Sequence, residues 1–504
     1  MQVVAACAAA IAAWFSVVAV LGVLVAIVAL AVLRLSRRDS AAVAAAYLAV
    51  IAVFPASLQA PTLGSVGTPQ IVLGVGCFAL WMVTWMMPRT ELRRPFRPVP
   101  LLLAAFVAAN LLSYVAACLR PTDVLERSAA DRGVVLLVAA VGGALLISES
   151  VGTLERFDVV LRAIVLGAAF VGLVGILQFT VGIDVASAIR LPGLRTAAEG
   201  SAFIGERSMF RRVSGTTAHA IEFSVVLCMA LPVAVHLLLH RSRAWMVPTA
   251  VVAVALPMSV SRTAVLGLLG LAVVLVPGWE RPVRRKVYVG AALYLLVMRL
   301  AIPGLLGTIR SLFVDAGVDP SITSRQTDYD YVTRFIAERP AFGRGFATFV
   351  PTRYDFLDNQ YLLSVVETGY VGAGTFVLML LGGMLVAQSV RRHAALEMHR
   401  DLAQALTASL AVALFTSIAF DFLSFATVRA LLFVLLGCVG ALWRLAPRRV
   451  RQALPPDDDV LTSAALAAAR RRAAARLAAV SWGPAGAPSA RSVQVRSHPR
   501  RGTP

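Results

Sequence analysis

The sequence predicts an all-α, polytopic integral membrane protein. Its 504 residues are 59% hydrophobic and only 15% charged, and the mean hydropathy is +0.79. The apolar residues form long uncharged runs that recur along the chain, and a helix needs about 20 such residues to cross a bilayer. Soluble multidomain proteins do not carry runs of this kind, so that class is excluded.

The apolar runs predict about 12–13 membrane spans. In chain order they are 8–33, 41–58, 70–87, 99–118, 134–148, 159–181, 217–240, 245–260, 262–277, 286–302, 360–388, 404–420 and 424–445. The runs 134–148, 245–260 and 262–277 are short, which leaves the count open by one or two. No basic segment precedes the first run, which is also longer than a signal-peptide core of roughly 7–15 residues, so we expect it to remain as a span.

Basic residues follow alternate spans, and this predicts the orientation. Arginine and lysine gather after the first, third, seventh, ninth, eleventh and last spans. Short loops rich in these residues stay in the cytoplasm. We therefore expect a plasma-membrane protein whose N-terminus lies outside and whose C-terminus lies inside. The two long loops then share the extracytoplasmic face.

This orientation divides the chain into six regions. They are N-terminal spans (1–181), an extracytoplasmic loop (182–216), central spans (217–302), a large extracytoplasmic loop (303–358), C-terminal spans (359–445) and a basic cytoplasmic tail (446–504). Residues 461–480 fit a short basic helix on the inner leaflet, and 483–504 is expected to be disordered. The net charge of +20 fits attraction to anionic membrane lipid, so no nucleic-acid partner is expected. The five cysteines include no CxxC pair and are interpreted as packing residues, not as a metal site.

Arginines on the outer face are the first candidates for a functional site. Arg211 and Arg212 precede the seventh span, Arg262 lies in the turn between the eighth and ninth spans, and Arg325 lies in the large loop. A guanidinium group offers a fork of donors that matches phosphate oxygens, which a pyrophosphate-linked lipid would present at this depth. The alternative is snorkelling or a structural ion pair, and it is favoured for Arg211.

Carboxylates and amides at span ends are the second group of candidates. Glu222 and Glu367 fall in the first turns of apolar spans, where an ionisable group serves function, pairs with an arginine or interacts with the helix N-terminus. His219 is a candidate base or hydrogen-bond donor. Asp358 and Asn359 lie where the large loop becomes helix, and such residues cap helices. A carboxylate there would equally suit deprotonation of an acceptor hydroxyl, so both roles stay open for Asp358.

Four motifs in order resemble those of the bacterial O-antigen ligase and O-antigen polymerase family. They are "RRVSGTTAHAIEF", the Arg-x-x-x-Leu of Arg262, the Pro-x-x-Gly-x-Gly of "RPAFGRGFATF", and Asn359 followed after nine residues by Gly-x-x-Gly. Arg325 lies where members often place an arginine. The resemblance covers about 205–390. This sequence departs from the ligases at Asp358, where they carry a histidine, and the departure favours a polymerase or a glycan ligase with another acceptor.

The resemblance implies a metal-independent membrane glycosyltransferase without a cofactor. Such an enzyme transfers or polymerises glycan from a lipid-pyrophosphate donor of the undecaprenyl type to an acceptor hydroxyl, in cell-surface polysaccharide biosynthesis. The implied catalytic residues are Asp358, Arg262 and Arg325. The implied substrate-binding residues are Arg212, Asn359, Gly343, Gly345, Glu367, Gly369 and Gly372.

The implied partners are a lipid-linked oligosaccharide donor, a glycan or glycolipid acceptor, membrane lipid and polysaccharide-assembly proteins. The alternative function is a multi-pass transporter or lipid-linked oligosaccharide flippase, which would also use many spans. The two long outer loops and the lack of an evident internal repeat count against it.

Overall fold

The computed structural model describes residues 39–447 with gaps, together with 471–474. The gaps are 56, 62, 64–65, 87–95, 183–188, 190–192, 197–205, 208–209, 280, 305–306, 309 and 311–319. The predicted span 8–33 and most of the predicted tail lie outside the described residues. The chain divides into two compact units, Met1–Arg449 and Val450–Pro504, and the elements below belong to the first.

The described elements are almost all helices. The α-helices are α2 (Ser40–Val53), α3 (Pro69–Met86), α4 (Pro98–Cys118), α5 (Val124–Ser150), α6 (Leu154–Thr180), α8 (Ala220–His240), α9 (Met246–Ala255), α10 (Arg262–Gly278), α11 (Arg281–Ala301), α13 (Pro320–Glu338), α14 (Gln360–His393), α15 (Glu397–Thr416) and α16 (Ala426–Leu445). Short 3-10 helices are η3 (Arg243–Trp245), η4 (Leu256–Ser259) and η6 (Phe422–Ser424). The strands β1 (Leu58–Gln59) and β2 (Arg195–Thr196) pair antiparallel, as do β3 (Glu206–Arg207) and β4 (Phe210–Arg211).

The prediction of an all-α polytopic membrane protein is confirmed. Among the described residues, seven helices are long and apolar enough to cross a membrane, namely α3, α4, α5, α6, α8, α14 and α16. Shorter apolar helices cover Ser40–Val53, Arg243–Ser259 and Arg262–Gly278. Helices α11 and α15 coincide with the predicted spans 286–302 and 404–420, although they are not among the seven.

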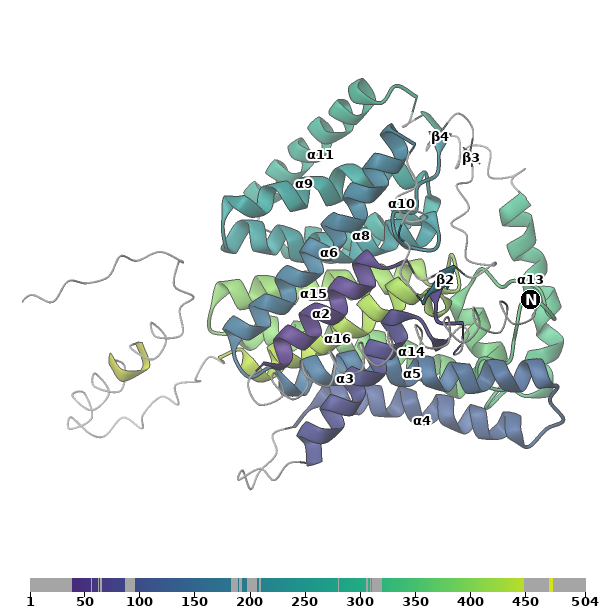
Figure 1. Cartoon of the computed structure of the whole chain (residues 1–504). Coiled ribbons are helices and arrows are strands. Elements are labelled where there is room, and N and C mark those ends of the chain that lie inside the picture. The colour runs from purple at the N-terminus through teal and green to yellow at the C-terminus, as the bar shows by residue number, and fades with distance from the viewer. Residues whose placement is uncertain are drawn as a thin grey trace, which may run out of the picture. The chain divides into compact units, whose positions relative to one another are not determined.

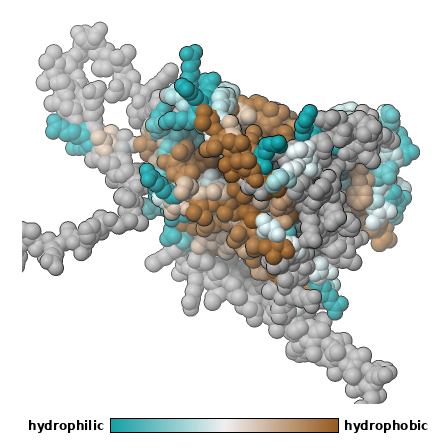
Figure 2. Space-filling model, turned by 90° about the horizontal axis from the view of Figure 1, so that it is seen from above, coloured by the Kyte–Doolittle hydropathy of each residue, from teal (hydrophilic) through white to brown (hydrophobic). Residues whose placement is uncertain are grey.

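The spans form an inner and an outer set. Within their most apolar windows, 78% of α8 and 83% of α16 is buried, compared with 33% of α3 and of α4. The long helices pack side by side, and α13 stands across their ends in Figure 1. The outer helices keep apolar side chains exposed, such as Leu269 on α10 and Leu293 on α11. A broad hydrophobic area on the described surface in Figure 2 fits contact with lipid tails.

Hydrogen bonds and ion pairs show which segments lie together at each end of the helical bundle. At one end Arg97 pairs with Glu149 at 2.6 Å, and Arg391 donates to the carbonyl of Gly278 at 3.2 Å. His240 at the end of α8 also bonds Asp401 near the start of α15 at 2.8 Å, and the described basic loops lie at this end. The starts of α8, α14 and α16 lie at the opposite end, which we call the loop end.

Helix α5 begins earlier than its apolar run predicts. The expected span was 134–148, but the helix starts at Val124 because Asp123 caps it, accepting a hydrogen bond from the N–H of Glu126 at 2.7 Å. The extra turns are polar and stand beside the large loop. The run of apolar residues located the span correctly but not this extension.

Candidate functional site

A cleft of about 670 Å³ lies at the loop end of the bundle. It is formed by five segments, namely the segment before α8, the start of α10, helix α13, the start of α14 and the loop after α15. The residues that line it are Arg212, His219, Ile221, Ser261, Arg262, Thr263, Val265, Leu266, Leu269, Asp328, Tyr329, Asp358, Asn359, Leu362, Ile418 and Ala419. Four of the predicted site residues, Arg212, Arg262, Asp358 and Asn359, therefore share one cleft although they are far apart in sequence.

Arg262 enters the cleft from a strained turn. After η4 ends at Ser259, Val260 adopts φ 44° and ψ 50°, which is the left-handed region. A β-branched residue rarely adopts this conformation, because its Cβ crowds the backbone, and the strain costs about 1–3 kcal/mol. The side chain of Val260 is fully buried, which holds the turn in place. The chain reverses here, so that α10 begins with Arg262 at the cleft.

Asn359, and not Asp358, caps helix α14. The side-chain oxygen of Asn359 accepts hydrogen bonds from the N–H groups of Tyr361 at 3.0 Å and Leu362 at 3.2 Å. Asp358 precedes the cap and lines the cleft. Asp358 is therefore not the cap, and the helix does not need its carboxylate to begin.

His219 presents a fixed imidazole to the cleft. It is the N-cap of α8, and its Nδ1 accepts a hydrogen bond from the N–H of Ile221 at 3.2 Å. Burial and the nearby Arg212 lower the pKa of His219, while Asp358 acts in the opposite direction. The ring is therefore neutral at pH 7, and because Nδ1 is an acceptor, its proton is on Nε2. Nε2–H is a hydrogen-bond donor, not a base.

Helix α13 forms the outer wall of the cleft. Asp328, which is 7% exposed, and Tyr329 line the cleft from this helix. The Nδ2 of Asn359 donates to the hydroxyl of Tyr329 at 3.4 Å and so joins α13 to α14. The sequence did not single out either residue; the polar run "TDYDY" was the signal available. The backbone of Arg325 lies in α13, but its side chain is outside the described residues.

The motif glycines do not line this cleft; they join the large loop to a break in α14. Gly369 has φ 67° and ψ −173°, which interrupts the helix. Loop residues 340–345 run beside the break, and four backbone hydrogen bonds connect the two segments. They are Arg344 N to Val366 O (2.9 Å), Gly345 N to Glu367 O (2.8 Å), Tyr370 N to Pro340 O (2.8 Å) and Val371 N to Ala341 O (3.2 Å). The loop thus satisfies the N–H and C=O groups that the break exposes.

Close backbone approach explains the glycines in these motifs. Gly343, Gly345 and Gly369 all have positive φ, at 66°, 133° and 67°. A Cβ on Gly369 would lie 2.6 Å from the backbone nitrogen of Phe342, and one on Gly372 would collide with the side chain of Thr368. Glycine alone fits such positions. Gly372 also borders a second cavity, together with Glu367.

The two glutamates predicted near span starts hold backbone groups. The carboxylate of Glu222, fully buried, accepts hydrogen bonds from the N–H groups of Thr427 at 2.7 Å and Val428 at 3.1 Å. It thereby caps α16 from the neighbouring helix α8. The carboxylate of Glu367 accepts from the N–H of Phe349 at 3.1 Å and so ties the large loop to α14.

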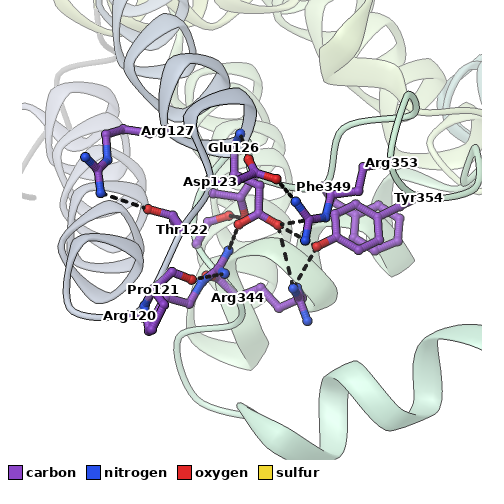
Figure 3. Close-up of polar contacts among 12 residues, drawn as sticks. Arg120, Pro121, Thr122, Asp123, Glu126, Arg127, Arg344, Phe349, Arg353 and Tyr354 are labelled. Carbon is purple, nitrogen blue, oxygen red and sulfur yellow. Dashed lines mark hydrogen bonds and ion pairs between the residues drawn. The ribbon is translucent and has the colours of Figure 1, made fainter.

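An ion-pair cluster anchors the large loop to the start of α5 (Figure 3). At its centre is Glu126, whose side chain is 2% exposed and lies 2.8 Å from Arg120. The hydroxyl of Tyr354 donates to Glu126 at 2.5 Å, and Arg344 and Arg353 each approach the same carboxylate to 3.8 Å. Burial and the hydrogen bond to Glu126 raise the pKa of Tyr354, so it remains a donor. The sequence did not indicate this cluster, because its members are about two hundred residues apart.

Comparison with known proteins supports the resemblance read from the motifs. Residues 247–377 match the family model described as O-antigen ligase. The resemblance to this family is confirmed over that range, which holds Arg262, Arg325, Asp358 and the motif glycines; Arg212 precedes it. A comparison with curated proteins finds no match for the sequence. In the described part of the chain, no three His, Cys, Asp or Glu side chains are arranged to hold a metal ion.

Proposed function

We propose that this membrane protein, with its O-antigen ligase match at residues 247–377, transfers or polymerises glycan from a lipid-pyrophosphate donor to an acceptor hydroxyl. The observation that carries the proposal is the cleft at the loop end. It combines two arginines, a carboxylate that no helix cap requires, and an apolar wall. This combination suits a ligand with an anionic head and a hydrocarbon tail.

Arg212 and Arg262 bind the pyrophosphate. A guanidinium group donates two parallel hydrogen bonds to phosphate oxygens and remains charged at any physiological pH. The apolar side chains of Val265, Leu266 and Leu269 continue from Arg262 along α10, and the last of these is 51% exposed toward the lipid-facing surface. The prenyl chain of an undecaprenyl-type donor leaves the cleft along this stripe.

Asp358 is the general base of the transfer. Its carboxylate accepts the proton of the acceptor hydroxyl while that oxygen attacks the anomeric carbon of the donor sugar. The new C–O bond forms as the bond from the anomeric carbon to the pyrophosphate oxygen breaks, with inversion. The electron pair leaves on the lipid pyrophosphate, whose growing negative charge the two arginines stabilise. The proton stays on Asp358 until it is released to solvent.

His219 and α13 support this step. The Nε2–H of His219 donates to an oxygen of the bound pyrophosphate, and the ring is held for this by its cap bond to α8. Asp328 and Tyr329 close the cleft from outside. Arg325 on the same helix is a further phosphate ligand.

The cleft faces the extracytoplasmic side of the plasma membrane. The basic loops gather at the opposite end of the bundle, and the positive-inside rule assigns that end to the cytoplasm. A site on the outer face has access to lipid-linked glycans that have already crossed the membrane and to acceptors in the cell envelope.

The test is transfer by the purified full chain in lipid nanodiscs. Lipid-linked oligosaccharide extracted from the source cells is supplied without any ion gradient, and products are resolved by size. We expect longer glycans or a glycosylated acceptor, together with free undecaprenyl pyrophosphate. The Asp358→Asn variant is the matched control, because it keeps the shape and removes the base.

A lipid-linked oligosaccharide flippase would give a different result. It would move the donor across the bilayer of a sealed vesicle without changing the length of the glycan. Movement without release of undecaprenyl pyrophosphate would contradict the proposal.

A further inference from the structure

A second cavity of about 420 Å³ lies inside the bundle, beside the cleft. It is enclosed by helices α4, α5, α14 and α16 and by loop residues 346–357. Arg132 and Asp355 at its mouth are exposed, whereas Phe106 and Gln360 at its depth are only 3% and 4% exposed. The cavity therefore opens at the loop end and narrows into the helical bundle.

The polar side chains of this cavity are held in fixed positions. The amide nitrogen of Asn110 donates to a carbonyl of its own helix at 2.7 Å. The side-chain oxygen of Gln360 accepts from the N–H of Leu423 at 2.7 Å, and the carboxylate of Glu367 accepts from the N–H of Phe349 at 3.1 Å. Side chains locked in this way form a pre-organised binding surface.

The chemical groups that line the second cavity indicate which class of ligand it binds. Asp421 and Glu367 supply carboxylates, Arg429 supplies a guanidinium, and aromatic rings such as Phe106 and Phe433 supply flat apolar faces. Lipid tails would leave these polar groups without partners, and an inorganic anion would leave the aromatic faces uncovered. A sugar ring fits both, because its hydroxyls exchange hydrogen bonds with carboxylates and amides and its C–H faces pack on aromatic rings. Burial raises the pKa of Asp421 to about 7, so near neutral pH this carboxyl group both accepts and donates.

A thin wall separates this cavity from the cleft. Leu357 and Gln360 face the cavity, while Asp358 and Asn359, between them in sequence, face the cleft. The N–H of Gln360 donates to the carbonyl of Ser417 at 2.8 Å and closes the wall. A single sugar cannot occupy both spaces, but a glycan chain can cross the rim of the wall at the loop end.

We propose that the second cavity is a carbohydrate-binding subsite for acceptor-glycan sugars remote from the hydroxyl that reacts. This assignment rests on the transferase function proposed above. The protein then holds the acceptor at two points and binds it more tightly than a single free sugar. The reacting sugar lies beside Asp358, and a distal sugar lies beside Asn110 and Glu367. The cavity then determines which glycan is extended.

Binding of neutral oligosaccharides to the donor-free protein tests this subsite. The full chain is placed in nanodiscs without glycoside detergent, and saturation-transfer NMR is recorded with maltotriose, cellotriose and triacetylchitotriose. We expect at least one trisaccharide to bind. Asn110→Leu removes the amide at nearly constant volume and should weaken this binding by about tenfold, the usual effect of one lost hydrogen bond. Thr407→Val, another buried polar side chain of a helix and outside both cavities, is the matched control and should bind normally.

Two results would overturn the assignment. One is the absence of binding by every trisaccharide. The other is binding that is lost in Arg262→Ala but unchanged in Asn110→Leu, which would place the sugar in the cleft. Because no donor is present, the result does not depend on turnover. Sugar binding in a protein that fails the transfer assay would count against the proposed function and not against the subsite.

Discussion

A Cβ atom placed on Gly343 would lie 2.6 Å from the backbone nitrogen of Gly369. The large loop and the broken helix α14 thus meet backbone to backbone, with no room for a side chain between them. The two glycine motifs, whose glycines the family resemblance implies to be substrate-binding, form the two halves of one backbone contact. They position the start of α14, and with it Asp358, relative to the loop.

Gly369→Ala is expected to destabilise the protein. The substituted residue would have to keep φ 67° and displace the loop backbone, at a cost of at least about 1–3 kcal/mol. Gly374→Ala is the matched control on the same helix, because a Cβ there meets nothing within 4 Å. Thermal unfolding of both variants in detergent provides the measurement. Equal midpoints for the two variants would contradict the role assigned to Gly369.

Asp358→Asn is expected to abolish most of the transfer activity without affecting folding. The cap of α14 belongs to Asn359, so the helix should form normally, whereas loss of a positioned base reduces turnover by about 10²–10⁴-fold. Transfer rate and membrane abundance are measured together. Glu397→Gln, which removes an exposed carboxylate at the start of α15, is the control. Retained activity in Asp358→His would add support, whereas full activity in Asp358→Asn would leave the arginines as the site.

Arg262→Ala is expected to weaken binding of undecaprenyl pyrophosphate by about tenfold to a hundredfold, since it removes charge-assisted hydrogen bonds. Arg262→Lys should fall between, because it keeps the charge but loses the planar fork. Arg392→Ala, an exposed arginine at the basic end, is the control. Binding is measured by native mass spectrometry. Unchanged affinity in Arg262→Ala would remove this residue from the clamp.

The orientation can be tested with a membrane-impermeant maleimide in a cysteine-free background. A cysteine at Thr352, exposed in the large loop, should be labelled in intact cells. One at Arg392 should react only after the membrane is opened. The reverse pattern would place the cleft in the cytoplasm and exclude an extracytoplasmic transferase.

Stability is expected to fall between about pH 4 and pH 7 through Asp421. Burial, aided by Asp358 and Glu222, raises the pKa of Asp421 from 3.8 to about 7. The folded state therefore holds this proton more tightly than the unfolded state, which stabilises the protein at low pH. This contribution to the free energy of unfolding, about 4 kcal/mol at most, is lost as pH rises through about 7. Asp421→Asn should flatten this part of the profile, while Glu397→Gln, an exposed carboxylate, should not. Unfolding midpoints at pH 5 and pH 8 decide the matter.

Hydropathy was sufficient to predict the fold class, and arginine placement together with the family motifs predicted the candidate cleft residues Arg212, Arg262 and Asp358. Long apolar runs and short motifs are local in sequence, so they can be read directly. The functions of Glu222 and Glu367 could not be read in this way, because each carboxylate binds backbone groups of a distant segment. The second cavity was missed for the same reason.

The ion-pair cluster around Glu126 has a consequence for biosynthesis. Its acidic centre lies in the first third of the chain, and Tyr354 follows it by 228 residues. A ribosome delivers the N-terminal helices to the membrane first. The start of α5 must therefore stand without its loop partners while the central helices are inserted. The cleft can assemble only after the large loop has been made and has docked, so a nascent chain lacks the complete cleft until its final helices are being made.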